Sequence, residues 1–244
     1  MMKILVANPN SSEIVTEVVM RSAKRKIINP NTEVIPLTNY RGTRNIDCAF
    51  ADYQSSWSSL RAIINKVEEV KADAVVLAGF GNVGIFALKE VLSIPVLSMS
   101  ETSMTVASLM GHKFTILTSM GQMIPLIEDL VRLYRLENKC ASIRAIDVNV
   151  EKCVTEKEKT LNGLKEEILK IVEHDGAEVV VLGSAGLCGY NEELQELVKL
   201  PVIDPVAVSV KMAEMMVESG LCHSKKRKFA NPPQELSVYL WDGK

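Results

Sequence analysis

Runs of apolar, mostly β-branched residues alternate with amphipathic segments along the chain, and this alternation predicts strands separated by helices. The predicted strands cover 3–7, 33–37, 74–78, 94–99, 113–118, 142–148, 179–183 and 201–204. The predicted helices cover 12–27, 58–70, 85–92, 123–134, 156–174, 192–198 and 206–219. Because the strands are nearly continuous runs of Val, Ile and Leu, we expect parallel sheets with helices on both faces.

The second half of the chain repeats the order of elements found in the first half. The repeat aligns Leu77 with Leu182, Gly79 with Ser184, and Gly81 with Gly186. A repeat of this length is too long for a solenoid unit and is typical of two similar α/β lobes. We expect a pseudo-twofold axis between the lobes and a cleft at their junction. The first lobe would comprise residues 1–100 and 205–244, and the second residues 101–204.

Four loops rich in small and polar residues follow the predicted strands, at 8–12, 79–82, 118–121 and 184–188. In open parallel sheets, ligands bind beyond the carboxyl ends of the strands, where the next helix presents free backbone N–H groups. The loops hold hydroxyls, amides and glycines but hardly any charge, which suits a small anion or an enolate-like oxygen. The alternative is that small residues only let helix and strand pack closely.

The segment GFGNVG, from Gly79 to Gly84, satisfies the dinucleotide-binding fingerprint, and Glu101 follows where a ribose-binding acid could lie. The fingerprint belongs to the first strand–helix turn of a domain, whereas this loop follows the third strand of its lobe. The matching loop in the second half breaks the spacing. We therefore expect no nicotinamide or flavin cofactor.

Charge and cysteine usage narrow the class of protein further. The chain has 244 residues, is 47% hydrophobic and carries a formal net charge of −2, which gives no reason to expect nucleic acid or a membrane as partner. Five scattered cysteines without CxxC spacing indicate reduced thiols in a cytoplasmic protein, and three distant histidines give no metal site. The basic run at 225–228 is expected to be a solvated loop.

Several longer motifs occur together and indicate a known family: NPNSS, GFGNVG, SETSMTVASLMGHKFTILTS, PLIEDLVRLY, DGAEVVVLGSAGL, LPVIDPVAVSVKMAE and SKKRKFANPP. On these motifs the chain resembles the aspartate/glutamate racemase superfamily and, within it, the hydantoin and allantoin racemases. The resemblance covers nearly the whole chain. It implies cofactor-free racemization, in which one cysteine thiolate removes the proton next to a carbonyl and a second cysteine returns one. It also implies a homo-oligomer and a small-molecule substrate.

The resemblance breaks at the two cysteine positions, which correspond to Gly79 and Ser184. Glycine has no proton to exchange, and a serine hydroxyl is far less acidic than a thiol. Two-thiol racemization is therefore not expected. Cys188 lies four residues beyond Ser184, near a predicted helix start that would favour a thiolate, although such a cysteine is more often packed in the core.

Three explanations stay open. In the first, Ser184 is an engineered replacement of a cysteine, made to trap a substrate. The natural protein would then carry one thiol opposite Gly79, as the related arylmalonate decarboxylases do. Alternatively, the scaffold catalyses another reaction on a hydantoin- or ureide-like compound through an enolate-like intermediate. In the third explanation, the chain binds such a compound without any reaction.

The resemblance also indicates which residues contact the substrate. Asn10, Thr118 and Ser119 match polar positions at the family's substrate site, and we expect them to form hydrogen bonds with it. Backbone N–H groups of Phe80, Gly81, Ala185 and Gly186 would add further donors, and the Phe80 ring could pack on an apolar substituent. The alternative role of each polar side chain is to cap a strand or helix end.

Overall fold

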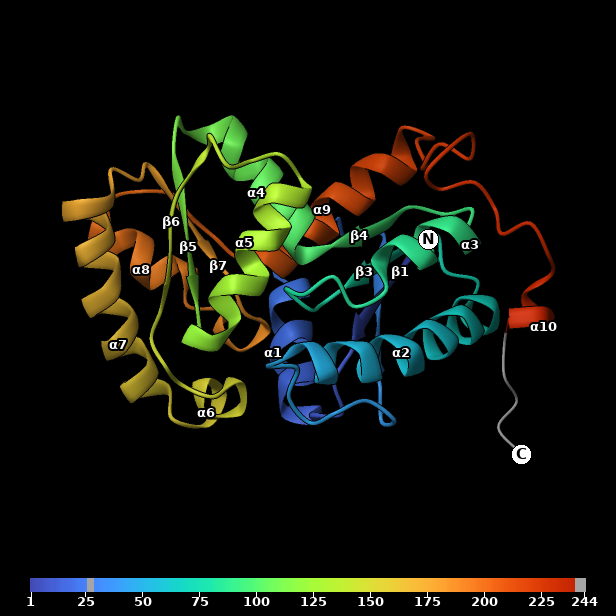
Figure 1. The fold of residues 1–244 in the computed structure, drawn as a ribbon, viewed down its shortest axis with the longest axis horizontal. Helices are drawn as coiled ribbons and strands as arrows, with labels where there is room; N and C mark the ends of the chain where they lie inside the picture. The colour runs from blue at the N-terminus through green and yellow to red at the C-terminus, as the bar shows by residue number, and fades with distance from the viewer. Residues whose placement is uncertain (26–28, 240–244) are drawn as a thin grey trace.

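Two parallel four-stranded sheets form the framework of the computed structural model, which describes residues 1–25 and 29–239 (Figure 1). The first sheet has the order β2-β1-β3-β4 and contains β1 (Met2–Asn8), β2 (Thr32–Thr38), β3 (Ala74–Leu77) and β4 (Val96–Ser98). The second sheet has the order β6-β5-β7-β8 and contains β5 (Phe114–Thr118), β6 (Cys140–Ala145), β7 (Val179–Leu182) and β8 (Val202–Ile203). The predicted fold of two similar α/β lobes is confirmed.

Helices connect the strands and cover both sheets. The larger ones are α1 (Glu13–Ala23), α2 (Ala49–Val70), α4 (Met99–Met110), α5 (Ile124–Leu133), α7 (Lys157–Lys170), α8 (Asn191–Val198) and α9 (Pro205–Glu218). The shorter ones are α3 (Ile85–Val91), α6 (Val150–Thr155), α10 (Leu236–Tyr239), the 3-10 turns η1 (Gly121–Met123) and η3 (Ala185–Leu187), and the π-helical turn η2 (Ile171–Asp175). None of the described helices is long and apolar enough to cross a membrane.

The register of the two sheets shows how closely the lobes correspond. In the first sheet Ala7 lies opposite Leu77, and in the second Leu117 lies opposite Leu182. One residue later, the N–H of Ala78 donates to Ala7 O and the N–H of Gly183 donates to Leu117 O, each at 2.8 Å. Gly79 and Ser184 therefore leave their sheets at equivalent points.

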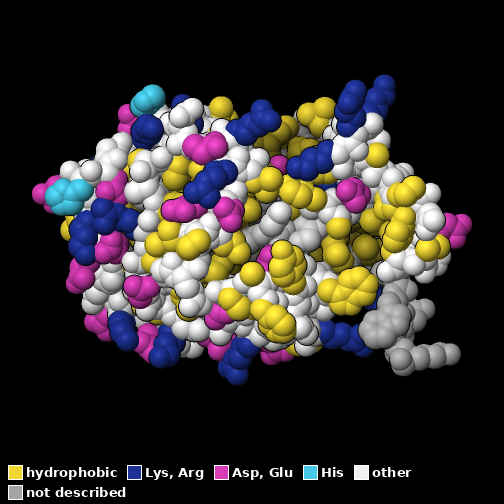
Figure 2. Space-filling model, viewed as in Figure 1, with side chains coloured by type: hydrophobic (Ala, Val, Ile, Leu, Met, Phe, Trp, Pro, Cys, Tyr) yellow, Lys and Arg dark blue, Asp and Glu magenta, His cyan; other side chains and the backbone are white. Residues whose placement is uncertain are grey.

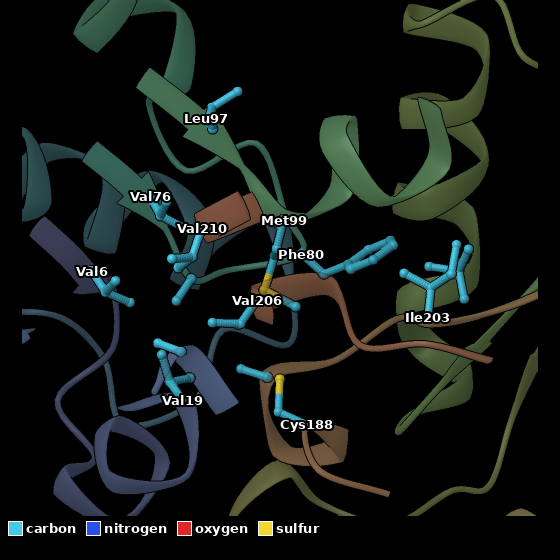
Figure 3. Packing of buried hydrophobic residues seen from close by; sticks show 14 of the residues in the cluster. Val6, Val19, Val76, Phe80, Leu97, Met99, Cys188, Ile203, Val206 and Val210 are labelled. Atoms are coloured by element: carbon cyan, nitrogen blue, oxygen red, sulfur yellow. The ribbon is translucent and has the colours of Figure 1, made fainter. Parts of the chain in front are cut away.

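Helices α4 and α9 exchange places between the lobes. Helix α4 follows β4 but packs on β5 and β7 of the second sheet, whereas α9 follows β8 but packs on β1, β3 and β4 of the first. The two helices also pack on each other, between the lobes in Figure 1. Their apolar faces join the two sheets into one hydrophobic core, in which Phe80, Met99 and Val206 belong to the same cluster (Figure 3).

The structure differs from the predicted elements mainly in its helices. Helix α4 was not expected, because its sequence MSETSMTVASLM is rich in Ser, Thr and Met; Ser98 Oγ caps it by accepting from the N–H of Glu101 at 3.1 Å. Helix α2 begins at Ala49, nine residues before the predicted start at 58, and α6 was also missed. The predicted end of the first helix at 27 lies outside the described residues.

Residues 225–228 form the expected loop with exposed side chains, except that Lys225 is half-buried. Lys225 Nζ donates to the carbonyl oxygens of Lys89, Glu90 and Leu92 at 2.7–2.8 Å, and so caps the C-terminal end of α3. Lys228 Nζ lies 3.9 Å from the centre of the Phe86 ring. The C-terminal segment therefore packs on α3 and is part of the first lobe's surface.

His223 in this segment makes the stability of the fold sensitive to acid. Its Nε2 accepts a hydrogen bond from the N–H of Val96 at 2.7 Å. Burial, and then the charges of Lys89 and Lys225, lower the pKa of His223 from 6.5 to about 4. The unfolded chain therefore binds more protons between these two pH values, so the stabilising contribution is complete above pH 6.5 and is lost as pH falls toward 4.

Urea unfolding at about pH 7 and about pH 4.5 measures this contribution. We expect the unfolding free energy to fall less between these pH values in a His223→Gln variant, because the amide oxygen of Gln can accept the bond and does not titrate. Equal pH dependence in the two proteins would show that His223 does not carry the effect.

Candidate active site

One cavity of about 50 Å³ lies where the four loops meet between the sheets. Pro9 and Asn10 line it after β1, 78–81 and Val83 after β3, 118–120 after β5, and 183–185 after β7. Ile46, Met123 and Val150 complete the wall. Among the described residues, none that lines the cavity has a charged side chain, so its polar character comes from hydroxyls, one amide and the backbone.

The structure brings most of the predicted site residues to this cavity. Those that line it are Asn10, Gly79, Phe80, Gly81, Thr118, Ser119, Ser184 and Ala185. Gly186 is buried beneath the wall, where a Cβ would lie 2.6 Å from Val150 O, so close packing requires glycine there. Cys188 lies outside the cavity wall and lines a separate groove between α1 and α7.

Hydroxyl groups tie the loop after β5 to the loop after β7. Ser119 Oγ donates to Ser184 Oγ at 3.1 Å, and Thr118 Oγ1 donates to the carbonyl oxygen of Gly183 at 3.1 Å. Within the described chain, Ser119 is the hydrogen-bond partner of Ser184 Oγ. Since neither a histidine nor a lysine contacts it there, Ser184 has no neighbouring base to activate its hydroxyl.

Asn10 combines a structural role with a free donor. Its Oδ1 accepts from Asn8 Nδ2 and from the N–H of Ser12, each at 2.9 Å. Its own N–H donates to Asn8 Oδ1 at 3.2 Å, so the side chain is fixed at the start of α1. Asn10 Nδ2 makes no hydrogen bond to the described residues and can donate to a ligand in the cavity.

Gly79 faces Pro9 across the cavity wall. A Cβ at Gly79 would lie 2.8 Å from Pro9 Cγ and 3.4 Å from Val83 Cγ2. Glycine therefore lets the loop after β3 approach the loop after β1 closely, and any side chain at position 79 requires the Pro9 ring to move.

Residues 43–47 of the first lobe reach across to the second lobe beside the cavity. Arg44 Nε donates to both oxygens of Glu151 at 3.0 and 2.9 Å, Ser12 Oγ donates to Glu151 Oε1 at 2.7 Å, and Gln122 Nε2 donates to Asp47 O at 2.9 Å. Hydrogen bonds from Arg44 and then Ser12 lower the pKa of Glu151. Sequence patterns held no signal for these contacts, because the partners lie far apart along the chain.

The described cysteines do not supply a thiolate to the cavity. Burial, followed by the charge of Asp204, raises the pKa of Cys188 well above its usual value, and the next helix begins only at Asn191. Burial also raises the pKa of Cys140 to about 11 and that of Cys153 to about 12. Cys48 and Cys222 are exposed at other places on the surface.

Comparison with known proteins places the chain in a family. A sequence model of the Asp/Glu/Hydantoin racemase family matches residues 4–213. A hydantoin racemase from Rhizobium meliloti is 32% identical over 95% of this chain and 95% of its own length. The structure of an allantoin racemase from Klebsiella pneumoniae has a TM-score of 0.92 and 29% identity, covering 96% of this chain and 95% of that one.

A more distant structure, that of arylmalonate decarboxylase, has a TM-score of 0.61 at 15% identity over 89% of this chain and 93% of that one, which shows a shared fold. The resemblance inferred from the motifs is confirmed by the family match and the curated relative. The chain belongs to the Asp/Glu/hydantoin racemase family.

Proposed function

We propose that this chain binds a small cyclic ureide or related acid and stabilises its enolate-like form without a cofactor, while two-thiol proton exchange is lost. The observation that carries the proposal is the placement of Gly79 and Ser184. They reach one cavity from equivalent strand ends, and neither has a thiol. The family match supports the substrate class, since the relatives are named hydantoin and allantoin racemases.

The donors around the cavity suit an oxygen that gains negative charge. The backbone N–H groups of the 80–81 and 184–185 loops, the hydroxyl of Ser184, which accepts from Ser119 and keeps its own proton, and the amide of Asn10 are fixed before a ligand arrives. Preorganised donors of this kind stabilise an enolate more than its parent carbonyl. A neutral ring fits better than a dianion, because no cationic side chain among the described residues lines the cavity.

Proton transfer is the step that the cavity supports least. The described lining residues include no thiol, imidazole, amine or carboxylate that could remove a proton from a weak carbon acid. The chain should therefore bind its ligand and exchange the α-proton slowly, or bind without turnover.

The lack of a proton-transfer group in the cavity also favours a second candidate function, a small-molecule binding protein. A one-base decarboxylase or lyase activity, with Ser184 in place of the protonating cysteine, would instead release CO₂ from arylmalonates.

Solvent deuterium exchange and calorimetry on hydantoins, allantoin and arylmalonates test the proposal. We expect a member of the panel to bind and to raise the unfolding free energy by RT ln(1 + [L]/Kd), and with it the melting temperature, with little or no α-deuteration. Absence of binding across the whole panel would overturn the substrate class. Rapid exchange by the unmodified chain would overturn the claim that the missing thiols limit the reaction.

We also propose a homo-oligomer in the cytoplasm. Phe50, Tyr53 and Trp57 lie three and four residues apart on α2, with exposed fractions of 77%, 77% and 51%. Figure 2 shows hydrophobic side chains gathered over this helix. Exposed apolar stripes of this kind mark association surfaces. The free cysteines are compatible with a reducing compartment.

A further inference from the structure

The loop that carries Ser184 and Ala185 ends at Gly189, and side chains hold both backbone polar groups of that glycine. Gly189 has a left-handed φ of 98°. Its N–H donates to Asp204 Oδ2 at 2.9 Å, and its carbonyl oxygen accepts from Arg25 Nη2 at 3.0 Å. The far end of the 184–189 loop is thus fixed by two charged groups from outside the loop.

Asp204 itself is a buried carboxylate whose two oxygens have separate tasks. Its side chain lies between β8 and α9, and the residue is 4% exposed. Oδ1 caps α9 by accepting from the N–H groups of Val206 and Ala207 at 3.1 Å, and it also accepts from Ser22 Oγ at 2.6 Å. Oδ2 accepts from the N–H of Gly189.

Ser22, which donates to Asp204, lies in the last turn of α1, and Arg25, which donates to Gly189 O, lies two residues beyond the end of this helix at Ala23. Helix α1 begins directly after the loop that contains Asn10. Helix α1 therefore begins at the Asn10 wall of the cavity, and its C-terminal end contacts Asp204, which holds the loop of the opposite wall. A rigid helix in this position couples the two walls.

The equivalent position in the first lobe shows that capping alone does not require a carboxylate. Leu77 pairs with Ser98 in the first sheet, and Asp204 follows Ile203 at the corresponding place in the second. Ser98 Oγ caps α4 there by accepting from the N–H of Glu101 at 3.1 Å. Burying a charge is costly unless each oxygen is hydrogen-bonded, so the bond from Oδ2 to the loop accounts for a carboxylate at 204.

We propose that Asp204 is a positioning residue, which sets the Ser184–Ala185 wall of the cavity against the Asn10 wall through Gly189 and Ser22. The proposal rests on the proposed function only where ligand affinity is the readout. Its direct consequence is structural: without the Oδ2 bond, the 184–189 loop should open more often than the rest of the lobe.

Asp204→Asn separates the two tasks of this side chain. The amide oxygen can keep the cap and the bond from Ser22, but the amide NH₂ then faces the N–H of Gly189, donor against donor. Ser98→Ala is the matched control, because it removes a cap at the equivalent position and touches no bond to the 184–189 loop.

Alkylation of Cys188 by iodoacetamide, mapped by peptide mass spectrometry, measures opening of the loop, since this side chain is 5% exposed. We expect the rate to rise about tenfold or more in Asp204→Asn and to stay unchanged in Ser98→Ala. Urea unfolding of each variant, followed by circular dichroism, reports any loss of global stability separately.

A change in thiol acidity could also raise the rate, because the charge of Asp204 raises the Cys188 pKa whereas that of Arg25 lowers it. Arg25→Met removes the bond to Gly189 O and shifts the acidity in the opposite direction. We expect it to accelerate alkylation as well, so faster labelling in both variants identifies opening of the loop. If Asp204→Asn fails to fold, the Cys188 alkylation rate is measured in Ser22→Ala and Arg25→Met instead.

Calorimetry with hydantoin as the probe adds the functional readout, with an expected loss of affinity of about tenfold in Asp204→Asn and none in Ser98→Ala. If hydantoin and the rest of the panel do not bind the unmodified chain, the proposed function is wrong. The alkylation rates still test whether Asp204 positions the 184–189 loop. Equal Cys188 alkylation in Asp204→Asn, Arg25→Met and Ser98→Ala would overturn the positioning role.

Discussion

The double variant Gly79→Cys/Ser184→Cys is expected to exchange the α-proton of a hydantoin with solvent about 10²–10⁴-fold faster than the unmodified chain. The reason is that both positions line the cavity at equivalent strand ends, so thiols there would stand beside a bound ligand. At position 184 the new sulfur would also receive the hydrogen bond that Ser119 now donates to Ser184 Oγ at 3.1 Å, which favours thiolate. Deuterium incorporation followed by NMR measures the rate, and circular dichroism measures racemization.

Gly79→Ser is the matched control for this variant. It keeps Ser184 and imposes the same steric demand at position 79, where a Cβ would lie 2.8 Å from Pro9 Cγ, but it supplies no acidic thiol. We expect the control to show no acceleration. If the double variant binds hydantoin but remains as slow as the control, the cavity holds its ligand with the α-carbon away from these positions.

Gly186→Ala is expected to destabilise the fold by about 1–3 kcal/mol and to weaken ligand binding. An added Cβ would lie 2.6 Å from Val150 O and 3.2 Å from Cys153 Cβ, so either the wall of the cavity or α6 has to move. The movement would displace Ala185, which lines the cavity immediately before it.

Gly163→Ala provides the contrast for that substitution. Gly163 lies inside α7, and a Cβ there would be 3.7 Å from Ile146 Cβ, an ordinary contact. Removing a helix-interior glycine should stabilise the chain by about 0.5–1 kcal/mol. Urea unfolding distinguishes the two variants. A neutral or stabilising Gly186→Ala would show that the packing beneath the cavity wall is looser than the structure indicates.

The sheets and the four loops could be predicted because they depend on local patterns. Buried strands such as Val179–Leu182 are continuous apolar runs, and the loops that follow them contain Gly and Ser at matching places in the two halves. The carboxyl ends of parallel strands share one edge of their sheet, so the repeat places Gly79 and Ser184 at equivalent edges of two sheets. The expected pseudo-twofold axis between the lobes then predicts that these edges face a common cleft. That cleft is the cavity that both residues line.

Contacts between distant segments could not be predicted in the same way. Asp204 and Ser22 are far apart in sequence, and no local pattern indicates that their side chains meet. The contacts of Arg44 and Gln122 beside the cavity depend on how the lobes face each other. Helix α4 escaped prediction because its Ser- and Thr-rich sequence has weak helix propensity, and its packing against α9 stabilises it instead.

An amide-resolved NMR titration with hydantoin tests the central claim most directly. The largest backbone shifts should fall on Phe80, Gly81 and Ala185, from both lobes at once, because these N–H groups surround the shared cavity. Shifts confined to one lobe, or centred on the groove near Arg21 and Lys157, would contradict a ligand held between the equivalent loops of the two lobes.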